Sequence, residues 1–190
     1  MKLRSVLLLS CLLASLPSAA ATPGSAELDA FDASMRTARL PNGITLAYTE
    51  RGPRDGVPVV MIHGFTNNAR NWAGLAPLLD PSLHLILVDA RGHGHSSRPE
   101  CCYTRIDMAY DVKLLMDQLH IPSAHLIGHS MGSLIAQMLA ENGADIAING
   151  FGKAGAIETE RAGIEKTFGV RCIYVAADIS KPDDCAKMVA

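Results

Sequence analysis

One stretch, AHLIGHSMGSLIA at residues 124–136, decides how this chain is expected to fold. A short apolar run leads into GHSMG at residues 128–132, and a helix-forming run follows. This order fits the G-x-S-x-G pattern, in which a strand turns sharply into a helix and presents a serine as a nucleophile. The turn is expected to hold Ser130 in a strained conformation with its hydroxyl facing outward. The N–H of Met131, at the helix start, then points to where an oxyanion would form.

The neighbours of the serine have their own parts in this interpretation. Gly128 and Gly132 are needed because backbone approaches backbone in such a turn, where a Cβ would clash. His129 completes the pentapeptide, and its side chain is expected to leave the turn in another direction from the serine hydroxyl. The alternative is a glycine-rich turn with an incidental serine, which a pentapeptide alone leaves open. Features upstream of the turn favour the nucleophile elbow.

Residues 58–62 are a continuous apolar run, and residues 83–89 are a second, largely apolar segment before the elbow. Such segments are typical of strands that are buried on both faces of a sheet. Residues 103–120 have apolar side chains at three- and four-residue spacing, which predicts a helix between the second strand and the elbow strand. Residues 40–48 predict a hairpin with Asn-Gly as its turn. Strands that alternate with helices in this way indicate the α/β class.

Residues 38–137 resemble the α/β-hydrolase family through three motifs that occur in the family's order. The motifs are HGFT at residues 63–66, DARGHGHS at residues 89–96, and the elbow. The resemblance implies a mostly parallel sheet with helices on both faces, here as a truncated three-layer sandwich. It also implies that the backbone N–H of Phe65 is a second oxyanion donor. The side chain of His63 is expected to be a packed turn histidine.

The loop at residues 89–96 is expected to be structural. Its glycines permit tight turns, and Asp89 and Arg91 can cap and pair locally. His93 and His95 also raise the idea of a metal site. Two histidines two residues apart, with no third ligand nearby, make a poor site, so no metal is expected.

After the elbow, residues 138–190 resemble a second family, the short-chain dehydrogenases of the 3-hydroxybutyrate type. GADIAINGFG at residues 143–152 corresponds to the second strand of that nucleotide fold, and the next helix and third strand follow. The resemblance implies that Asp178 contacts the adenine of NAD. The family's T-G-x-x-x-G-x-G and Tyr-x-x-x-Lys patterns are not intact. Joined at the elbow helix, the two parts are expected to keep one βαβ unit, with the next strand beside the elbow strand.

An elbow serine is a weak nucleophile until a histidine takes its proton and an acid orients that histidine. In α/β-hydrolases the order is serine, acid, histidine. Asp178 is a weak candidate for the acid, but the last histidine of the chain is His129. The expected function is therefore a serine hydrolase of esterase type, acting on a small ester-like substrate without a cofactor and impaired by the missing base. The alternatives are an NAD-dependent oxidoreductase fragment and a non-catalytic fusion remnant.

The N-terminus predicts export. Lys2 and Arg4 precede an apolar run that Pro17-Ser18 breaks, and Ala19-Ala20-Ala21 supplies a small-residue cleavage pattern. Residues 1–21 therefore read as a signal peptide, and the mature chain is expected to be periplasmic or secreted. A membrane anchor would need a longer run, and a lipoprotein site at Cys11 is the weaker alternative because apolar residues continue beyond it.

Composition excludes other classes of function. The formal net charge is −2, and the sequence has no basic stripe, so nucleic acid is not expected as a partner. The mature chain also has no run of 18 apolar residues, so no membrane span is expected in it. Cys101 and Cys102 are adjacent and are expected to be too strained to bond each other. Pairing of either with Cys172 or Cys185 is left open, and no Cys/His cluster has zinc spacing.

Overall fold

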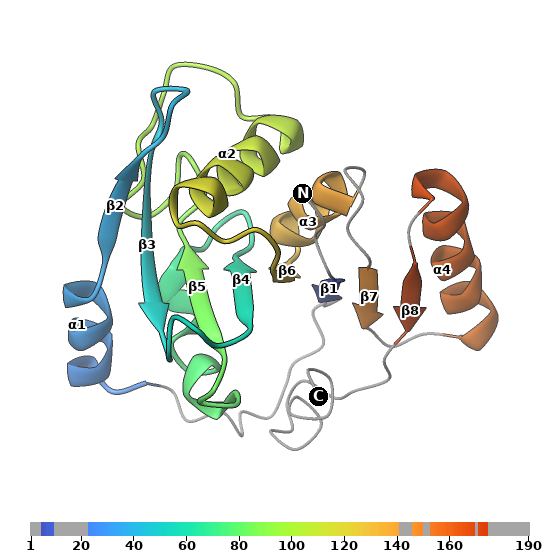
Figure 1. Cartoon of the computed structure of the whole chain (residues 1–190), viewed down its shortest axis with the longest axis horizontal. Helices are drawn as coiled ribbons and strands as arrows, with labels where there is room; N and C mark the ends of the chain where they lie inside the picture. The colour runs from blue at the N-terminus through green and yellow to red at the C-terminus, as the bar shows by residue number, and fades with distance from the viewer. Residues whose placement is uncertain (1–4, 10–22, 141–145, 150–152, 170, 175–190) are drawn as a thin grey trace.

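The computed structural model describes residues 5–9, 23–140, 146–149, 153–169 and 171–174 (Figure 1). Its centre is an eight-stranded sheet in the order β2-β3-β5-β4-β6-β1-β7-β8. The strands are β1 (Ser5–Leu9), β2 (Arg36–Arg39), β3 (Thr45–Arg51), β4 (Pro58–Ile62), β5 (His84–Val88), β6 (His125–His129), β7 (Ile146–Asn149) and β8 (Cys172–Tyr174). The helices are α1 (Ser25–Ala33), α2 (Arg105–Gln118), α3 (Met131–Ala140) and α4 (Ala154–Phe168), with 3-10 turns η1 (Ala69–Trp72) and η2 (Ala76–Leu78).

The sheet is mixed and mostly parallel, as predicted. Among the described strands, the antiparallel pairs are β2 with β3 and β3 with β5. The other neighbouring strands pair in parallel. The β2–β3 connection is the predicted hairpin, and Gly43 in its turn has φ of 86°, a conformation that glycine adopts without steric cost. None of the helices in the described part of the chain has the length and apolar character needed to cross a membrane.

Two apolar cores lie on opposite faces of the sheet. In β4, Val60 and Ile62 face one core, whereas Val59 and Met61 face the other. β5 alternates in the same way, because successive side chains of a strand point to opposite faces. Residues of α2, α3 and α4 cover the first core, and residues of α1, η1 and η2 cover the second. This confirms the predicted three-layer sandwich and explains why both strands read as unbroken apolar runs.

Helix α2 begins at a capping box and ends shortly before His120. The hydroxyl of Thr104 accepts a hydrogen bond from the N–H of Asp107, whose carboxylate in turn accepts from the N–H of Thr104. This capping box satisfies two backbone donors that the first turn leaves without partners. His120, with φ of 59°, lies just beyond the last turn. The helix is therefore slightly shorter than the predicted segment 103–120.

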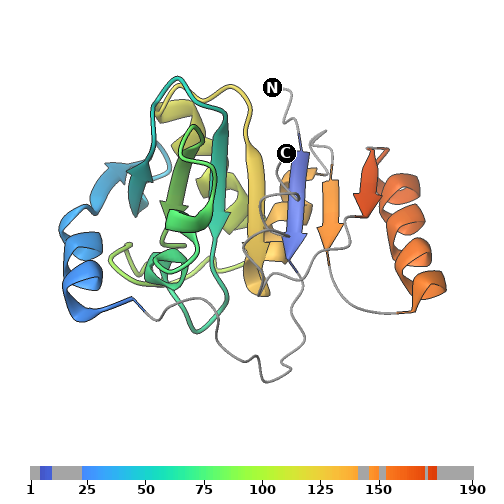
Figure 2. The same ribbon diagram turned by 90° about the horizontal axis from the view of Figure 1, so that it is seen from below.

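Strand β1 is the main departure from expectation. It lies between β6 and β7 and is parallel to both, so that Leu7 pairs with Ile127 on one side and Ala147 on the other. Figure 2 shows it in the middle of the sheet. The prediction that the strand after the elbow helix lies beside the elbow strand is therefore wrong. The crossover through α3 instead spans two strand spacings, about 10 Å, because the apolar run of the predicted leader occupies the intervening position. Whether residues 1–21 are removed stays a prediction.

The cysteines also differ from expectation. Cys101 and Cys102 form a disulfide with each other, so the prediction that strain would prevent this pairing is wrong. In an extended chain, adjacent side chains point to opposite sides. Cys102 departs from that geometry with a left-handed φ of 71°. Cys172 is a free, buried thiol on β8, and Cys185 lies outside the described residues.

Candidate active site

The elbow has the conformation predicted from its sequence. β6 ends at His129, Ser130 has φ of 51°, and α3 begins at Met131. Left-handed backbone is unfavourable for a residue with a Cβ, and such strain at a turn is typical of functional sites. The Ser130 side chain is exposed. The backbone oxygen of Ser130 accepts from the N–H of Ser133, which closes the first turn of α3 over the serine.

Both elbow glycines are required by close backbone contacts. A Cβ on Gly128 would lie 2.4 Å from the carbonyl carbon of Gly132. A Cβ on Gly132 would lie 2.1 Å from the backbone oxygen of Ile62, at the end of the neighbouring strand β4. These opposing atoms belong to the backbone and cannot rotate away. The glycines thus let the start of α3 sit against the ends of β4 and β6.

Replacing Gly132 by alanine is expected to lower the free energy of unfolding by about 3 kcal/mol, because the clash with Ile62 requires movement of packed backbone. Urea unfolding monitored by circular dichroism measures the loss. Gly163→Ala in α4 is the matched control, since a Cβ there meets nothing within 4 Å. That variant should keep or slightly raise stability, because alanine is the better helix former. Equal stability of the two variants would contradict the close contact at Gly132.

The turn after β4 lies directly against the elbow. A Cβ on Gly64 would be 2.9 Å from Nδ1 of His129 and 3.5 Å from Cβ of Ser130. β4 and β6 are neighbouring parallel strands, so their carboxyl ends reach the same edge of the sheet. Phe65 follows Gly64 directly, and Met131 follows Ser130 at the start of α3. As the first residue of α3, Met131 has an N–H without an intrahelical acceptor.

The side chain of His63 is structural, which confirms the prediction made for it. Its ring is fully buried, with Nδ1 donating to the backbone oxygen of Gly64 at 2.7 Å. Nε2 accepts from the backbone N–H of Ala90 at 3.0 Å. Both ring nitrogens are therefore engaged in holding the turn after β4 against the loop after β5. A base for Ser130 would need a ring nitrogen that is not already occupied in this way.

Two histidines make stability depend on pH. Burial lowers the pKa of His63 and of His125 below the ordinary value of 6.5. The unfolded chain therefore takes up protons more readily at these positions, and protonation favours unfolding. The stability that the neutral rings contribute is present above pH 6.5 and is lost as the pH falls toward the folded-state values.

The free energy of unfolding is accordingly expected to fall between about pH 7 and pH 5. Urea titrations at several pH values measure this slope. A His125→Gln variant should show a shallower slope, because one of the two groups no longer titrates. His95→Gln changes an exposed ring and is the control that should leave the slope unchanged. An unchanged slope in His125→Gln would contradict the prediction.

Asp89 joins the loops around the site. Its carboxylate is buried and accepts from the N–H of Ala69 at 2.6 Å and from the N–H of His95 at 2.7 Å. The local capping predicted for Asp89 is confirmed. The local pairing predicted for Arg91 is wrong, because its guanidinium forms a buried ion pair with Asp111 of α2, at 2.5 Å. Local sequence gave no signal for a partner that depends on how α2 packs.

His93 has a contact that sequence reasoning missed. Its Nε2 donates to the backbone oxygen of Phe65 at 2.6 Å, and its Nδ1 lies 2.9 Å from the backbone oxygen of Arg91. The Phe65 ring packs edge-on against the His93 ring. His93 thus fixes the peptide after Phe65 and is a positioning residue for the turn that carries the candidate oxyanion donor.

The described residues bring no base to Ser130. Nδ1 of His129 is buried against Gly64 and has no hydrogen-bond partner in the described part of the chain. Among the described residues, no histidine nitrogen is hydrogen-bonded to the Ser130 hydroxyl. Asp178, the weak candidate for the acid and for an adenine contact, lies outside the described residues. Within the described residues, no group of three or more His, Cys, Asp or Glu side chains is placed to hold a metal ion.

Comparison with known proteins agrees with this geometry. Residues 57–150 match the family model described as alpha/beta hydrolase fold. The chain is 36% identical over 99 residues to the non-heme chloroperoxidase of Streptomyces lividans, covering 52% of this chain and 36% of the relative. It is 31% identical over 98 residues to the haloalkane dehalogenase of Bradyrhizobium diazoefficiens, covering 52% of this chain and 32% of the relative. The chain spans about a third of the length of these curated relatives.

Solved structures show the same likeness. One described as "Novel epoxide hydrolases belonging to the alpha/beta hydrolases superfamily in metagenomes from hot environments" has a TM-score of 0.57 and 31% identity, covering 60% of this chain and 41% of that chain. This chain therefore has the α/β-hydrolase fold, truncated relative to that structure, and the match to the family model covers residues 57–150.

The family segment extends past residue 137, where the resemblance was expected to end. None of the relatives described above is a dehydrogenase, so the resemblance of residues 138–190 to short-chain dehydrogenases gains no support from them. Strands β7 and β8 pair in parallel, and α4 connects them. These elements show that the later part of the chain continues the sheet, which both families would do.

Proposed function

We propose that this chain is an exported serine hydrolase of esterase type with Ser130 as its nucleophile, impaired because the described residues bring no base to that serine. One observation carries the proposal: exposed Ser130 has a left-handed backbone between the end of β6 and the start of α3, with the turn after β4 packed against it. The leader-like composition of residues 1–21 supports export.

The chemistry follows from which groups meet at the turn. Attack of a hydroxyl on an acyl carbonyl moves negative charge onto the carbonyl oxygen. The N–H groups of Phe65 and Met131 would stabilise that oxyanion. His93 holds the peptide after Phe65 and so limits the movement of this donor. A serine at this position favours acyl transfer over the other reactions in the relatives' names, because a hydroxyl between such donors is the arrangement that acyl transfer uses.

Among the described residues, the proposed site has no evident group to accept the proton of the Ser130 hydroxyl. No histidine follows Ser130 in this 190-residue chain. His63 has both ring nitrogens occupied, and His93 contacts two backbone oxygens. Without a general base the hydroxyl stays protonated and nucleophilic attack is slow. The proposed site therefore has the turn that positions Ser130 and the N–H groups that would stabilise an oxyanion. Among the described residues it lacks a general base that would activate the Ser130 hydroxyl.

Labelling with a fluorophosphonate probe tests the nucleophile. Folded protein should be labelled slowly and at Ser130 alone, as mapped by peptide mass spectrometry. Ser130→Ala should abolish the label. Ser133→Ala is a matched control three residues away, since that hydroxyl is buried and donates to the backbone oxygen of Gly128. Labelling of other serines in place of Ser130, or no labelling of folded protein, would refute the proposal.

A further inference from the structure

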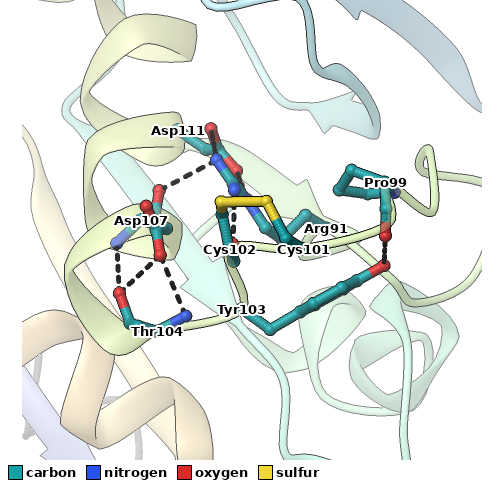
Figure 3. Close-up of a disulfide and its surroundings, with 8 residues drawn as sticks. All are labelled: Arg91, Pro99, Cys101, Cys102, Tyr103, Thr104, Asp107 and Asp111. Atoms are coloured by element: carbon teal, nitrogen blue, oxygen red, sulfur yellow. Dashed lines mark hydrogen bonds and ion pairs between the residues drawn. A yellow bond between two sulfur atoms is a disulfide. The ribbon is translucent and has the colours of Figure 1, made fainter.

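An exposed pair of adjacent cysteines lies in the segment between the loop after β5 and helix α2. Cys101 and Cys102 are bonded to each other, and the side chains of both are exposed. Figure 3 shows the disulfide drawn across the Arg91 side chain, with Asp111 above it and the α2 cap residues Thr104 and Asp107 to its left. No step of the proposed hydrolysis uses it. The inference drawn from it does not rest on the proposed function.

The segment around the disulfide is fixed on both sides. The hydroxyl of Tyr103 donates to the backbone oxygen of Pro99 at 2.6 Å. The guanidinium of Arg91 donates to the backbone oxygen of Cys102 at 2.5 Å (Figure 3). Thr104 caps α2 directly after it. These contacts do not involve sulfur, so they persist when the sulfur–sulfur bond opens and keep the two thiols beside each other.

The surroundings favour the thiolate form of the opened pair. The Arg91 guanidinium, which also pairs with Asp111, donates to the peptide of Cys102, and the N-terminus of the 14-residue helix α2 begins a few residues later. Cationic side chains and helix N-termini both stabilise thiolates, which are the reactive form of cysteine. Exposure gives small thiols access to the sulfurs.

Cys172 provides a contrast within the same chain. It is buried on β8, and burial raises the pKa of its thiol to about 11. A buried, protonated thiol neither attacks nor exchanges readily. The two sites differ in exposure and in charge, so reagents that act on thiolates should distinguish them.

We propose that Cys101–Cys102 is a thiol–disulfide exchange site whose reduced form binds thiophilic metalloids such as trivalent arsenic. In the exchange, the thiolate of a small thiol attacks one sulfur, a mixed disulfide forms, and the other cysteine leaves as a thiolate. A second small thiol attacks the mixed disulfide. The protein disulfide thereby gains two electrons and two protons, and the two small thiols leave as their own disulfide.

Binding of trivalent arsenic follows from the spacing of the reduced pair. An organic arsenoxide reacts with two thiols, forming two arsenic–sulfur bonds and releasing its oxygen as water. Neither sulfur is oxidised, so no further reactant is needed. Adjacent cysteines held by the Tyr103–Pro99 and Arg91–Cys102 contacts close a small ring around one arsenic atom. A single thiol forms only one such bond and releases the metalloid easily.

The test uses the full-length folded chain, reduced glutathione and phenylarsine oxide. Oxidised protein should give no adduct. After equilibration with millimolar glutathione, intact-protein mass spectrometry should show one phenylarsenic group per chain, and peptide mapping should place it on Cys101 and Cys102. Ethanedithiol, which is itself a dithiol, should remove the adduct, and a single thiol should not.

Two variants sharpen the result. Cys102→Ser should lose the stable adduct, and Cys172→Ser should bind as the wild type does. The peptide mapping on wild-type protein keeps the proposal testable if Cys102→Ser fails to fold. If glutathione reduced the Cys101–Cys102 disulfide only in urea, the proposed exchange in the folded chain would be overturned. An adduct that persists in Cys102→Ser, or no adduct on the reduced folded chain, would overturn the binding site.

Discussion

This chain is expected to hydrolyse p-nitrophenyl acetate with a rate enhancement on the order of 10³-fold over water, far below that of a complete serine hydrolase. The reason is that the described residues bring no proton acceptor to Ser130, and removing a triad member leaves only oxyanion stabilisation and binding. The N–H groups of Phe65 and Met131 would supply that remainder. Initial rates at several substrate concentrations, corrected for spontaneous hydrolysis, measure it. Ser130→Ala should reduce the rate little, because an unactivated hydroxyl contributes little.

Fast turnover would contradict this expectation. A rate of about ten per second, ordinary for enzymes, that Ser130→Ala abolishes would mean that a histidine of this chain does act as the base. His63→Ala and His93→Ala would then identify which one. Loss of activity in His93→Ala alone would need a second measurement, because His93 also fixes the peptide after Phe65. Unchanged urea unfolding of that variant would indicate that the loss of activity does not come from a loss of folding.

Replacing Asp111 by alanine is expected to lower the free energy of unfolding by about 3–5 kcal/mol. Asp111 and Arg91 are both almost fully buried, and their charged groups meet at 2.5 Å. The hydrogen bond from Arg91 to Asp111 raises the pKa of the guanidinium. Arginine side chains are not deprotonated in proteins even without such a partner, so Arg91 stays charged in the variant. An uncompensated charge then remains in the interior between the loop after β5 and α2. Asn42 would lose its contact with the same carboxylate.

The control for this variant lies on the same helix. Asp117 pairs with Lys113 on the surface of α2, where both side chains are well exposed. Asp117→Ala should change stability by less than about 1 kcal/mol, since exposed pairs are weak. Urea unfolding of the two variants under identical conditions makes the comparison. A loss of similar size in both would mean that the Arg91–Asp111 pair is no more important than a surface pair.

Much of the fold could be predicted because backbone contacts and burial leave few choices of residue. β4 and β5 read as unbroken apolar runs because each touches a core on both faces. The elbow could be identified because a Cβ at Gly128 or Gly132 collides with backbone. Buried strands and glycines in close backbone contact can therefore be identified from the local sequence.

Other features depend on how distant segments pack, and for that reason they could not be predicted. The partner of Arg91 is set by the docking of α2, 20 residues further along the chain. The contact between His93 and Phe65 requires two loops to meet at one edge of the sheet. The Cys101–Cys102 bond depends on the left-handed backbone of Cys102, which nothing in the residue types around it announces.

The position of β1 has a consequence for the order of events during synthesis. Leu7 leaves the ribosome early, but its pairing partner Ile127 is made about 120 residues later. At 5–20 residues per second this delay lasts roughly 6–24 s. Throughout it the apolar segment has no sheet to join, and it is then available to a targeting factor. If residues 1–21 act as the predicted leader, capture during that interval and closure of the sheet around β1 would compete for the same five residues, and translation speed would set how many molecules take each route.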